Sequence, residues 1–212
     1  MLITVFTPTY NRAKLLPRLH KSLQEQTNKD FEWVIVDDGS TDNTKEVIEK
    51  IIIEQEDNIP IRYFYKENGG KHTAINQGVK LALGELFLIL DSDDSLPVYS
   101  LEKIQTFYNE SKAQLNFGGV CGLMGHHDGT RIGSGFPSKT LYANTIELRY
   151  KYQITGDLLE IFKTDVLKEY PFPEITGERF CPEALLWNRI ARKYKLYCFK
   201  EIIYFRDYLD GG

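Results

Sequence analysis

The sequence predicts an α/β protein with a mostly parallel central sheet and helices on both of its faces. Two observations support this prediction. Apolar, β-branched segments alternate with amphipathic segments at short spacing through residues 1–94, the pattern of parallel strands joined by right-handed crossover helices. Polar or charged residues also follow each apolar segment. Because such sheets bind ligands beyond the carboxyl ends of their strands, we expect a ligand site along one edge of the sheet.

Four strands are expected in this first half, each a short run of apolar residues. They are Leu2–Thr7, which Pro8 is expected to stop, then Glu32–Val36, Ile61–Tyr65 and Leu86–Leu90. The polar segments that follow them are residues 7–12, 37–40, 66–71 and 91–94.

Three helices are expected between these strands, at residues 12–26, 41–55 and 70–83. The first carries leucines at helical spacing. In the second, Ser40 or Thr41 could cap the N-terminus, and the expected buried stripe is Val47, Ile48, Ile51 and Ile52. Gly84 stands where a C-terminal cap of the third helix would lie.

The pattern becomes more mixed after residue 94. Helices are expected at residues 100–111, 144–150, 164–169 and 182–193, and strands at 158–162, 196–199 and 202–205. The glycine-rich run Phe117–Gly125 suggests a hairpin or added strands. The end, residues 208–212, resembles a chain stopped within a loop, so we expect a C-terminal truncation.

The composition is that of an ordinary soluble globular protein. The chain has 212 residues, 42% hydrophobic and 26% charged, with a net charge of −4, which excludes a global basic field for nucleic acid. The three cysteines, Cys121, Cys181 and Cys198, form no CxxC pair, which favours a reducing compartment over a zinc site. We see no signal peptide and no apolar stretch of about 20 residues, so a cytoplasmic location is expected.

The segment Leu86–Pro97, LFLILDSDDSLP, carries the clearest chemical signal. Five apolar residues run directly into the carboxylates of Asp91, Asp93 and Asp94. A hard divalent cation such as Mg²⁺ or Mn²⁺ would relieve their mutual repulsion, and such ions combine one or two carboxylates with substrate phosphates. The competing interpretation is an acidic turn that caps the following helix.

Several common site motifs are absent from the sequence. The loop Gly69-Gly70-Lys71-His72 fails the Walker pattern, because Tyr65 and His72 replace the required glycine and Ser/Thr. The first strand lacks a GxGxxG loop, and no GxSxG nucleophile elbow occurs.

Five motifs, in order, resemble those of the inverting family 2 glycosyltransferases of the GT-A fold. They are FTPTYNR (6–12), VIVDDGSTD (34–42), ENGGKHTAINQG (67–78), LDSDD (90–94) and FPEITGERFCPEALLWNRIARKYK (172–195). The last is similar to the catalytic-base helix of the bacterial polysaccharide branch. The resemblance implies one domain over residues 1–212, with a nucleotide-sugar-binding half (1–94) and an acceptor-side half (95–212).

The resemblance also implies a nucleotide-sugar donor, usually a uridine diphosphate sugar, and Mg²⁺ or Mn²⁺. By position, Thr7, Pro8, Tyr10 and Arg12 would line the nucleotide pocket, Asp38 with Asp37 beside it would read the uracil edge, and Lys71 would approach the phosphates. Asp91 would hold the ribose, and Asp93, with Asp91 next to it, would ligate the metal.

The resemblance assigns a general base to the start of the 182–193 helix. The family's aspartate is replaced here by Glu183, which helical spacing puts on the face of Leu186 and Trp187. Glu178 is the rival base, and Asp157 is a weaker acceptor-side candidate.

The expected acceptor is a saccharide or a lipid-linked saccharide, in the synthesis of a cell-surface polysaccharide. The basic cluster Arg189, Arg192, Lys193 and Lys195 could bring the chain to the inner face of the plasma membrane, or could be a solvated helix face. Two other functions remain open: a sugar nucleotidyltransferase and a non-catalytic nucleotide-sugar-binding module.

Overall fold

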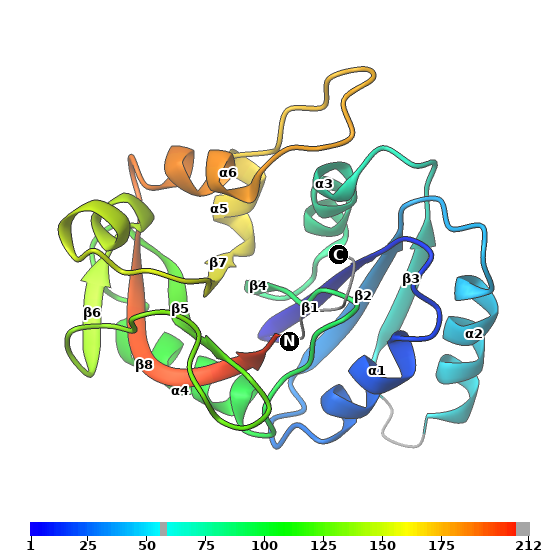
Figure 1. The fold of residues 1–212 in the computed structure, drawn as a ribbon, viewed down its shortest axis with the longest axis horizontal. Coiled ribbons are helices and arrows are strands. Elements are labelled where there is room, and N and C mark those ends of the chain that lie inside the picture. Colours follow the sequence, from blue (N-terminus) through cyan, green and yellow to red (C-terminus); the bar gives the residue numbers. More distant parts are fainter. Residues whose placement is uncertain (56–58, 207–212) are drawn as a thin grey trace.

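The computed structural model describes residues 1–55 and 59–206, and the end of the chain at 208–212, where a truncation is expected, lies outside them. Within these residues one eight-stranded sheet has the order β3-β2-β1-β4-β7-β5-β8-β6 (Figure 1). Its strands are β1 (Ile3–Thr9), β2 (Phe31–Asp37), β3 (Ile61–Tyr65), β4 (Leu86–Ile89), β5 (Phe117–Gly125), β6 (Thr140–Ala143), β7 (Leu158–Lys163) and β8 (Lys195–Phe205).

The helices are close to those expected from the sequence. They are α1 (Leu16–Gln24), α2 (Thr44–Glu54), α3 (Lys71–Leu81), α4 (Ser100–Ser111), α5 (Thr164–Glu169) and α6 (Glu183–Ile190), and a short π-helix, η1 (Glu147–Lys151), replaces the expected helix at 144–150. Among the described residues, no helix is long and apolar enough to span a bilayer.

The predicted parallel arrangement is confirmed for the first half, where β1 pairs in parallel with β2 and β4, and β2 with β3. The second half joins the same sheet through β7, which runs antiparallel between β4 and β5. The run Phe117–Gly125 is an added strand, not a local hairpin, because β5 pairs with β7 and β8. The two expected C-terminal strands are one strand, β8, whose register against β5 is irregular.

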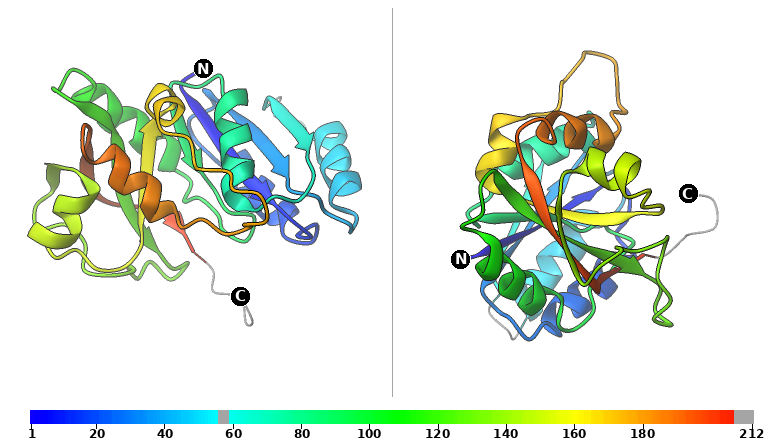
Figure 2. Two further views of the ribbon diagram at one scale, coloured as in Figure 1. Left: turned by 90° about the horizontal axis from the view of Figure 1, so that it is seen from above. Right: turned by 90° about the vertical axis from the view of Figure 1, so that its left-hand side faces the viewer.

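Two hydrophobic layers sandwich the sheet. On one face, α1, α2 and α4 pack against residues such as Val5, Trp33 and Leu159. On the other face, α3, α5, α6 and η1 pack against Phe6, Phe87 and their neighbours. Figure 2 shows helices on both sides of the twisted sheet. The face that carries α3 and α6 is the one on which the site is built.

Some expected boundaries are wrong, for identifiable reasons. Pro8 does not stop the first strand, because β1 extends to Thr9 beside β2 while its pairing with β4 already ends at Phe6. The missing N–H of Pro8 therefore removes no hydrogen bond to β4.

Two expected helix caps are also absent. Neither Ser40 nor Thr41 caps α2, which starts at Thr44 after Asn43. Gly84 is not the cap of α3, since Ala82 takes that place in an extended conformation. Gly84 instead allows a close backbone approach, because a Cβ there would lie 2.4 Å from the Thr4 nitrogen. In the buried stripe of α2, Ile48 and Ile51 are buried but Ile52 is 37% exposed.

Candidate functional site

A cavity of about 270 Å³ opens at the carboxyl ends of β1, β2 and β4, where the polar segments after the expected strands predicted a ligand site. We call it the strand-end cavity. It is lined by Pro8, Thr9, Tyr10, Arg12, Asp38, Lys71, Asp91, Ser92 and Asp93. Most of the residues assigned to nucleotide binding by the sequence therefore lie together.

The loop after β1 is fastened to the loop after β2. Asn11 has a left-handed backbone (φ 52°), and its Oδ1 accepts a hydrogen bond of 2.8 Å from the Thr41 N–H. The Asn11 N–H in turn donates to Ser40 Oγ at 2.8 Å. Asp42 Oδ2 accepts from the Ala13 N–H. These contacts fix Tyr10 and Arg12 at the rim of the strand-end cavity.

Asp38 organises the third loop of this edge. Its carboxylate accepts hydrogen bonds from the backbone N–H groups of Gly69 at 3.0 Å and Gly70 at 2.7 Å, and it pairs with Lys66 at 2.6 Å. The side chain is only 6% exposed. Asp38 thus ties the turn after β2 to the loop that begins α3.

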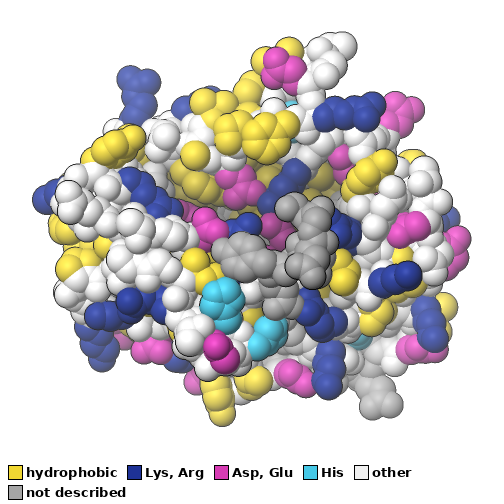
Figure 3. Space-filling model, in the orientation of Figure 1, with side chains coloured by type: hydrophobic (Ala, Val, Ile, Leu, Met, Phe, Trp, Pro, Cys, Tyr) yellow, Lys and Arg dark blue, Asp and Glu magenta, His cyan; other side chains and the backbone are white. Residues whose placement is uncertain are grey.

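A larger cavity, of about 620 Å³, adjoins the first. We call it the central cavity. Its walls come from the end of β4, β5, β7, β8, η1 and the start of α6, and they include Asp157, Glu160, Glu183 and Arg206. Lys71 and Asp91 line both cavities. Figure 3 shows acidic and basic side chains gathered in the hollow at the centre of this face, with hydrophobic side chains above it.

Lys71 forms ion pairs with two carboxylates at the place where the two cavities meet. Its ammonium lies 2.7 Å from Asp91 Oδ1 and 2.8 Å from Glu183 Oε1. Burial would lower the pKa of Lys71, but the two carboxylates outweigh burial and hold it well above its ordinary value. The first residue of α3 thereby joins the end of the next strand, β4, to the first residue of α6, about a hundred residues later in the sequence.

The three carboxylates after β4 have different surroundings. Asp91 pairs with Lys71, whereas buried Asp94 accepts a hydrogen bond of 2.6 Å from Tyr204 Oη. Burial, together with Asp91 and Asp94, raises the pKa of Tyr204 well above its ordinary value. The Asp93 carboxylate is partly exposed in the strand-end cavity and has no partner among residues 1–55 and 59–206, although its carbonyl accepts from Arg18.

These residues fit a divalent cation whose coordination is completed by the phosphates of a bound substrate. Within the described part of the chain, no group of three His, Cys, Asp or Glu side chains is placed to hold a metal. Asp93 does, however, present unpaired carboxylate oxygens beside Asp91. One or two carboxylates with substrate phosphates is the usual donor set for Mg²⁺.

Three of the residues that the sequence assigned to nucleotide binding or catalysis do not line either cavity. Thr7 is fully buried, and its Oγ1 accepts from Trp33 Nε1 at 2.9 Å on the opposite face of the sheet. Asp37 is also fully buried and accepts from Tyr63 Oη and from the Ser40 N–H, both at 2.8 Å. Glu178 is exposed in the loop before α6. Thr9 lines the strand-end cavity in place of Thr7.

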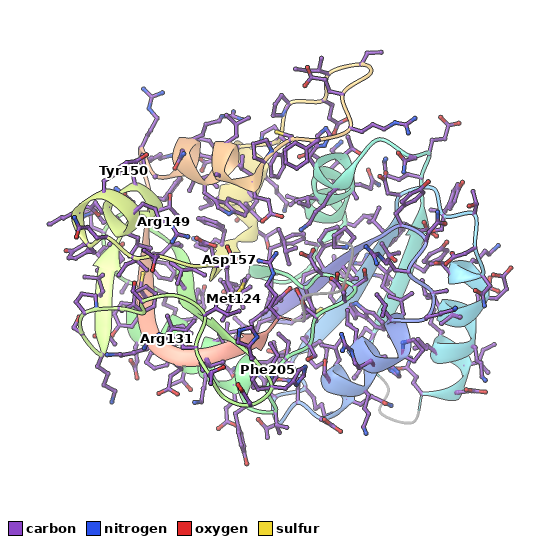
Figure 4. All side chains as sticks on the ribbon, in the orientation of Figure 1. Met124, Arg131, Arg149, Tyr150, Asp157 and Phe205 are labelled. Carbon is purple, nitrogen blue, oxygen red and sulfur yellow. The ribbon has the colours of Figure 1, made fainter. Side chains whose placement is uncertain are left out.

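The sequence did not point to Glu160 or Arg149, although both line the central cavity. Glu160 lies within β7, in a run of apolar residues that predicts a buried strand. A single carboxylate inside such a run was the available signal. Asp157, the weaker sequence candidate, pairs with Arg206 in the same wall. Figure 4 shows Arg149 on η1 and Asp157 just before β7.

The basic cluster after Trp187 is largely occupied by contacts within the protein. Arg189 donates to the Pro171 carbonyl at 2.9 Å, Lys193 pairs with Glu169 at 3.0 Å, and Lys195 pairs with Glu147 at 3.5 Å. These contacts favour a structural role for the cluster over a membrane-binding one.

Comparison with known proteins identifies relatives over most of the chain. The model of "Glycosyl transferase family 2" matches residues 4–169. A Campylobacter jejuni protein named GalNAc(5)-diNAcBac-PP-undecaprenol beta-1,3-glucosyltransferase is 30% identical over 206 residues, which is 96% of this chain and 64% of that protein. Glycosyltransferase GlyG of Streptococcus pneumoniae is 31% identical over 197 residues, 87% of this chain and 64% of GlyG.

A solved structure has the same fold. The structure of Staphylococcus aureus TarS 1–349 in complex with UDP-GlcNAc superposes with a TM-score of 0.77 at 26% identity. The match covers 100% of this chain and 60% of TarS 1–349. The chain therefore spans about two thirds or less of the length of these relatives.

Proposed function

Because the chain belongs to glycosyl transferase family 2, a family of GT-A fold, we propose that it transfers a sugar from a uridine diphosphate sugar to an acceptor hydroxyl, with inversion at the anomeric carbon. The observation that carries this proposal is the position of Lys71, which pairs with a carboxylate from each half of the site. A diphosphate that reaches Lys71 would lie where the strand-end cavity opens into the central cavity.

The donor nucleotide would occupy the strand-end cavity. Pro8, Tyr10 and Asp38 line this cavity; the two side chains Pro8 and Tyr10 would contact the base, and Asp38 would accept a hydrogen bond from uracil N3–H. Asp91 would hold the ribose, with Arg12 and Lys71 close to the phosphates. A Mg²⁺ or Mn²⁺ ion bound at Asp93, with Asp91 beside it, would neutralise charge on the leaving diphosphate.

Glu183 would act as general base. It lines the central cavity and shares the Lys71 ammonium with Asp91. A bound diphosphate would compete with Glu183 for the Lys71 ammonium, leaving the carboxylate to take the proton of an acceptor hydroxyl. That hydroxyl attacks the anomeric carbon as the diphosphate leaves, so a single displacement inverts the configuration.

The acceptor would be a saccharide, free or lipid-linked, in the cytoplasmic synthesis of a cell-surface polysaccharide. The name of the Campylobacter relative includes a lipid diphosphate. The loop before α6 adds exposed apolar side chains next to the central cavity, with Phe180 81% and Ile175 55% exposed. We propose that this loop, more than the basic cluster, would approach the inner face of the plasma membrane.

The decisive experiment compares Glu183→Gln with the exposed control Glu178→Gln. The enzyme is given UDP-glucose or UDP-N-acetylglucosamine with Mn²⁺ and octyl glycosides as acceptors, and release of UDP is measured. Glu183→Gln should still bind donor but lose about 10²–10⁴-fold in turnover, because only the base is removed. Glu178→Gln should retain nearly full turnover.

Each alternative predicts a different result. If Glu178→Gln abolishes transfer while Glu183→Gln does not, the base assignment is wrong. Release of pyrophosphate from a nucleoside triphosphate and a sugar phosphate would indicate a nucleotidyltransferase. Tight donor binding with no turnover under any condition would indicate a binding module.

A further inference from the structure

Glu160 is a charged residue in β7, between neighbours whose side chains belong to the two hydrophobic layers of the sheet. Leu159 and Ile161 point into the hydrophobic layer on one face of the sheet. Leu158 and Phe162 point to the other face, where Phe162 packs on Trp187 with ring centroids 4.7 Å apart. Because side chains alternate along a strand, Glu160 points to the same face as Leu158 and Phe162, and there it meets the central cavity.

Among the described residues, only the charge of nearby Arg149 and the backbone N–H of Glu160 itself offset the cost of burying the Glu160 carboxylate. Within residues 1–55 and 59–206, no hydrogen bond or ion pair from another residue reaches it. Its acidic neighbours on the cavity wall are already paired, Asp157 with Arg206 and Glu183 with Lys71. A partly buried carboxylate that receives no direct hydrogen bond or ion pair costs free energy, and a ligand in the cavity would recover part of it.

Arg149 supplies donors on the same wall. Its Nη1 donates to the carbonyls of Ile154 at 2.9 Å and Gly156 at 2.7 Å, which fixes the guanidinium on the loop before β7. A guanidinium has five N–H donors, so others remain for a ligand. The nearby guanidinium also opposes the effect of burial, which raises the pKa of Glu160 from its ordinary value of 4.5 to about 7.

We propose that Glu160 and Arg149 form a subsite that binds the hydroxyl groups of a pyranose ring. A carboxylate accepts and a guanidinium donates hydrogen bonds to vicinal hydroxyls, and apolar Leu158 and Trp187 beside them offer a surface for the ring. Neither residue lines the strand-end cavity, so the subsite acts on sugar and not on nucleotide. The inference rests on the proposed function, and the pyranose is either the transferred sugar or the acceptor sugar.

The test compares Glu160→Gln and Arg149→Lys with Glu110→Gln, an exposed control on α4. Binding of UDP, UDP-glucose and UDP-N-acetylglucosamine is measured by calorimetry with Mn²⁺, and turnover with octyl glycosides as acceptors. If the subsite holds the transferred sugar, Glu160→Gln weakens UDP-sugar binding about tenfold and leaves UDP binding unchanged. If it holds the acceptor, the acceptor KM rises by a similar factor and UDP-sugar binding is unchanged.

Two outcomes overturn the inference, and they can be told apart. Wild-type values for both variants, in a protein that binds UDP and transfers sugar, reject the subsite alone. A wild-type protein that binds neither UDP nor UDP-sugar rejects the proposed function and the subsite with it. Circular dichroism of each variant confirms that a loss of affinity is measured on folded protein.

Discussion

Replacing Glu160 by glutamine removes a partly buried carboxyl group that is ionised at high pH. Burial raises the pKa of Glu160 from 4.5 to about 7, so between these values the folded state binds the proton more tightly than the unfolded state does. The free energy of unfolding therefore falls as the pH rises from about 4.5 to about 7, and the loss is complete above that range. Glutamine has no such proton and avoids the loss.

The size of the effect follows from the same two values. The interval from 4.5 to about 7, at about 1.4 kcal/mol per pH unit, corresponds to roughly 3 kcal/mol. Water in the cavity screens part of this, so we expect Glu160→Gln to be more stable than the wild type by about 1–3 kcal/mol at pH 8. For a chain of this length that is a rise in melting temperature on the order of 5 °C. At pH 4.5 the variant and the wild type should melt alike.

The assay is thermal unfolding followed by circular dichroism at pH 4.5, 6, 7 and 8, with Glu110→Gln as the control. Each comparison is variant against wild type at one pH, so the titration of other groups largely cancels. A stability difference that does not change between pH 4.5 and pH 8, or a wild type that is the more stable at pH 8, would refute the reasoning about Glu160.

Three further predictions concern other parts of the site and core. Asp93→Asn should weaken Mn²⁺-dependent UDP binding more than Asp94→Asn, because Asp94 is held by Tyr204; the reverse order in calorimetric titrations contradicts the metal assignment. Asp38→Ala should reduce the preference for UDP over CDP in competition titrations, since cytosine N3 has no proton to donate. An equal loss of affinity for both nucleotides would mean that Asp38 only holds the loop at Gly69 and Gly70 and does not read the base. Gly78→Ala should destabilise the fold by about 1–3 kcal/mol in urea unfolding, because the added Cβ would lie 2.2 Å from the buried Phe6 ring; unchanged stability would mean that α3 can shift freely.

Much of the fold could be predicted from local patterns in the sequence. Short apolar runs and helical spacing located the elements of the first half, and the polar residues after each run marked the ligand edge. Side-chain direction was harder to predict. Thr7 and Pro8 are adjacent in the same motif, yet strand alternation sends Thr7 to Trp33 on one face while Pro8 lines the strand-end cavity.

The central cavity could not be predicted, because its walls depend on long-range pairing. Glu160 faces Glu183 and Arg149 only because β7 inserts between β4 and β5, and no local pattern specifies that insertion. Glu183 could be named because it lies in a recognisable helix. Glu160 carried a weaker signal, a single carboxylate within an apolar strand, which marks the residue as unusual but does not tell which cavity it lines.

The insertion of β7 between β4 and β5 also bears on how the chain folds during synthesis. Until residues 158–163 emerge from the ribosome, the second edge of β4 (Leu86–Ile89) has no strand beside it. An unpaired apolar edge is a template for association with other chains. Pairings between segments this far apart in sequence form slowly, because a long loop must close first. We expect the nascent first half to require protection until β7 arrives, and residues 1–94 expressed alone to aggregate.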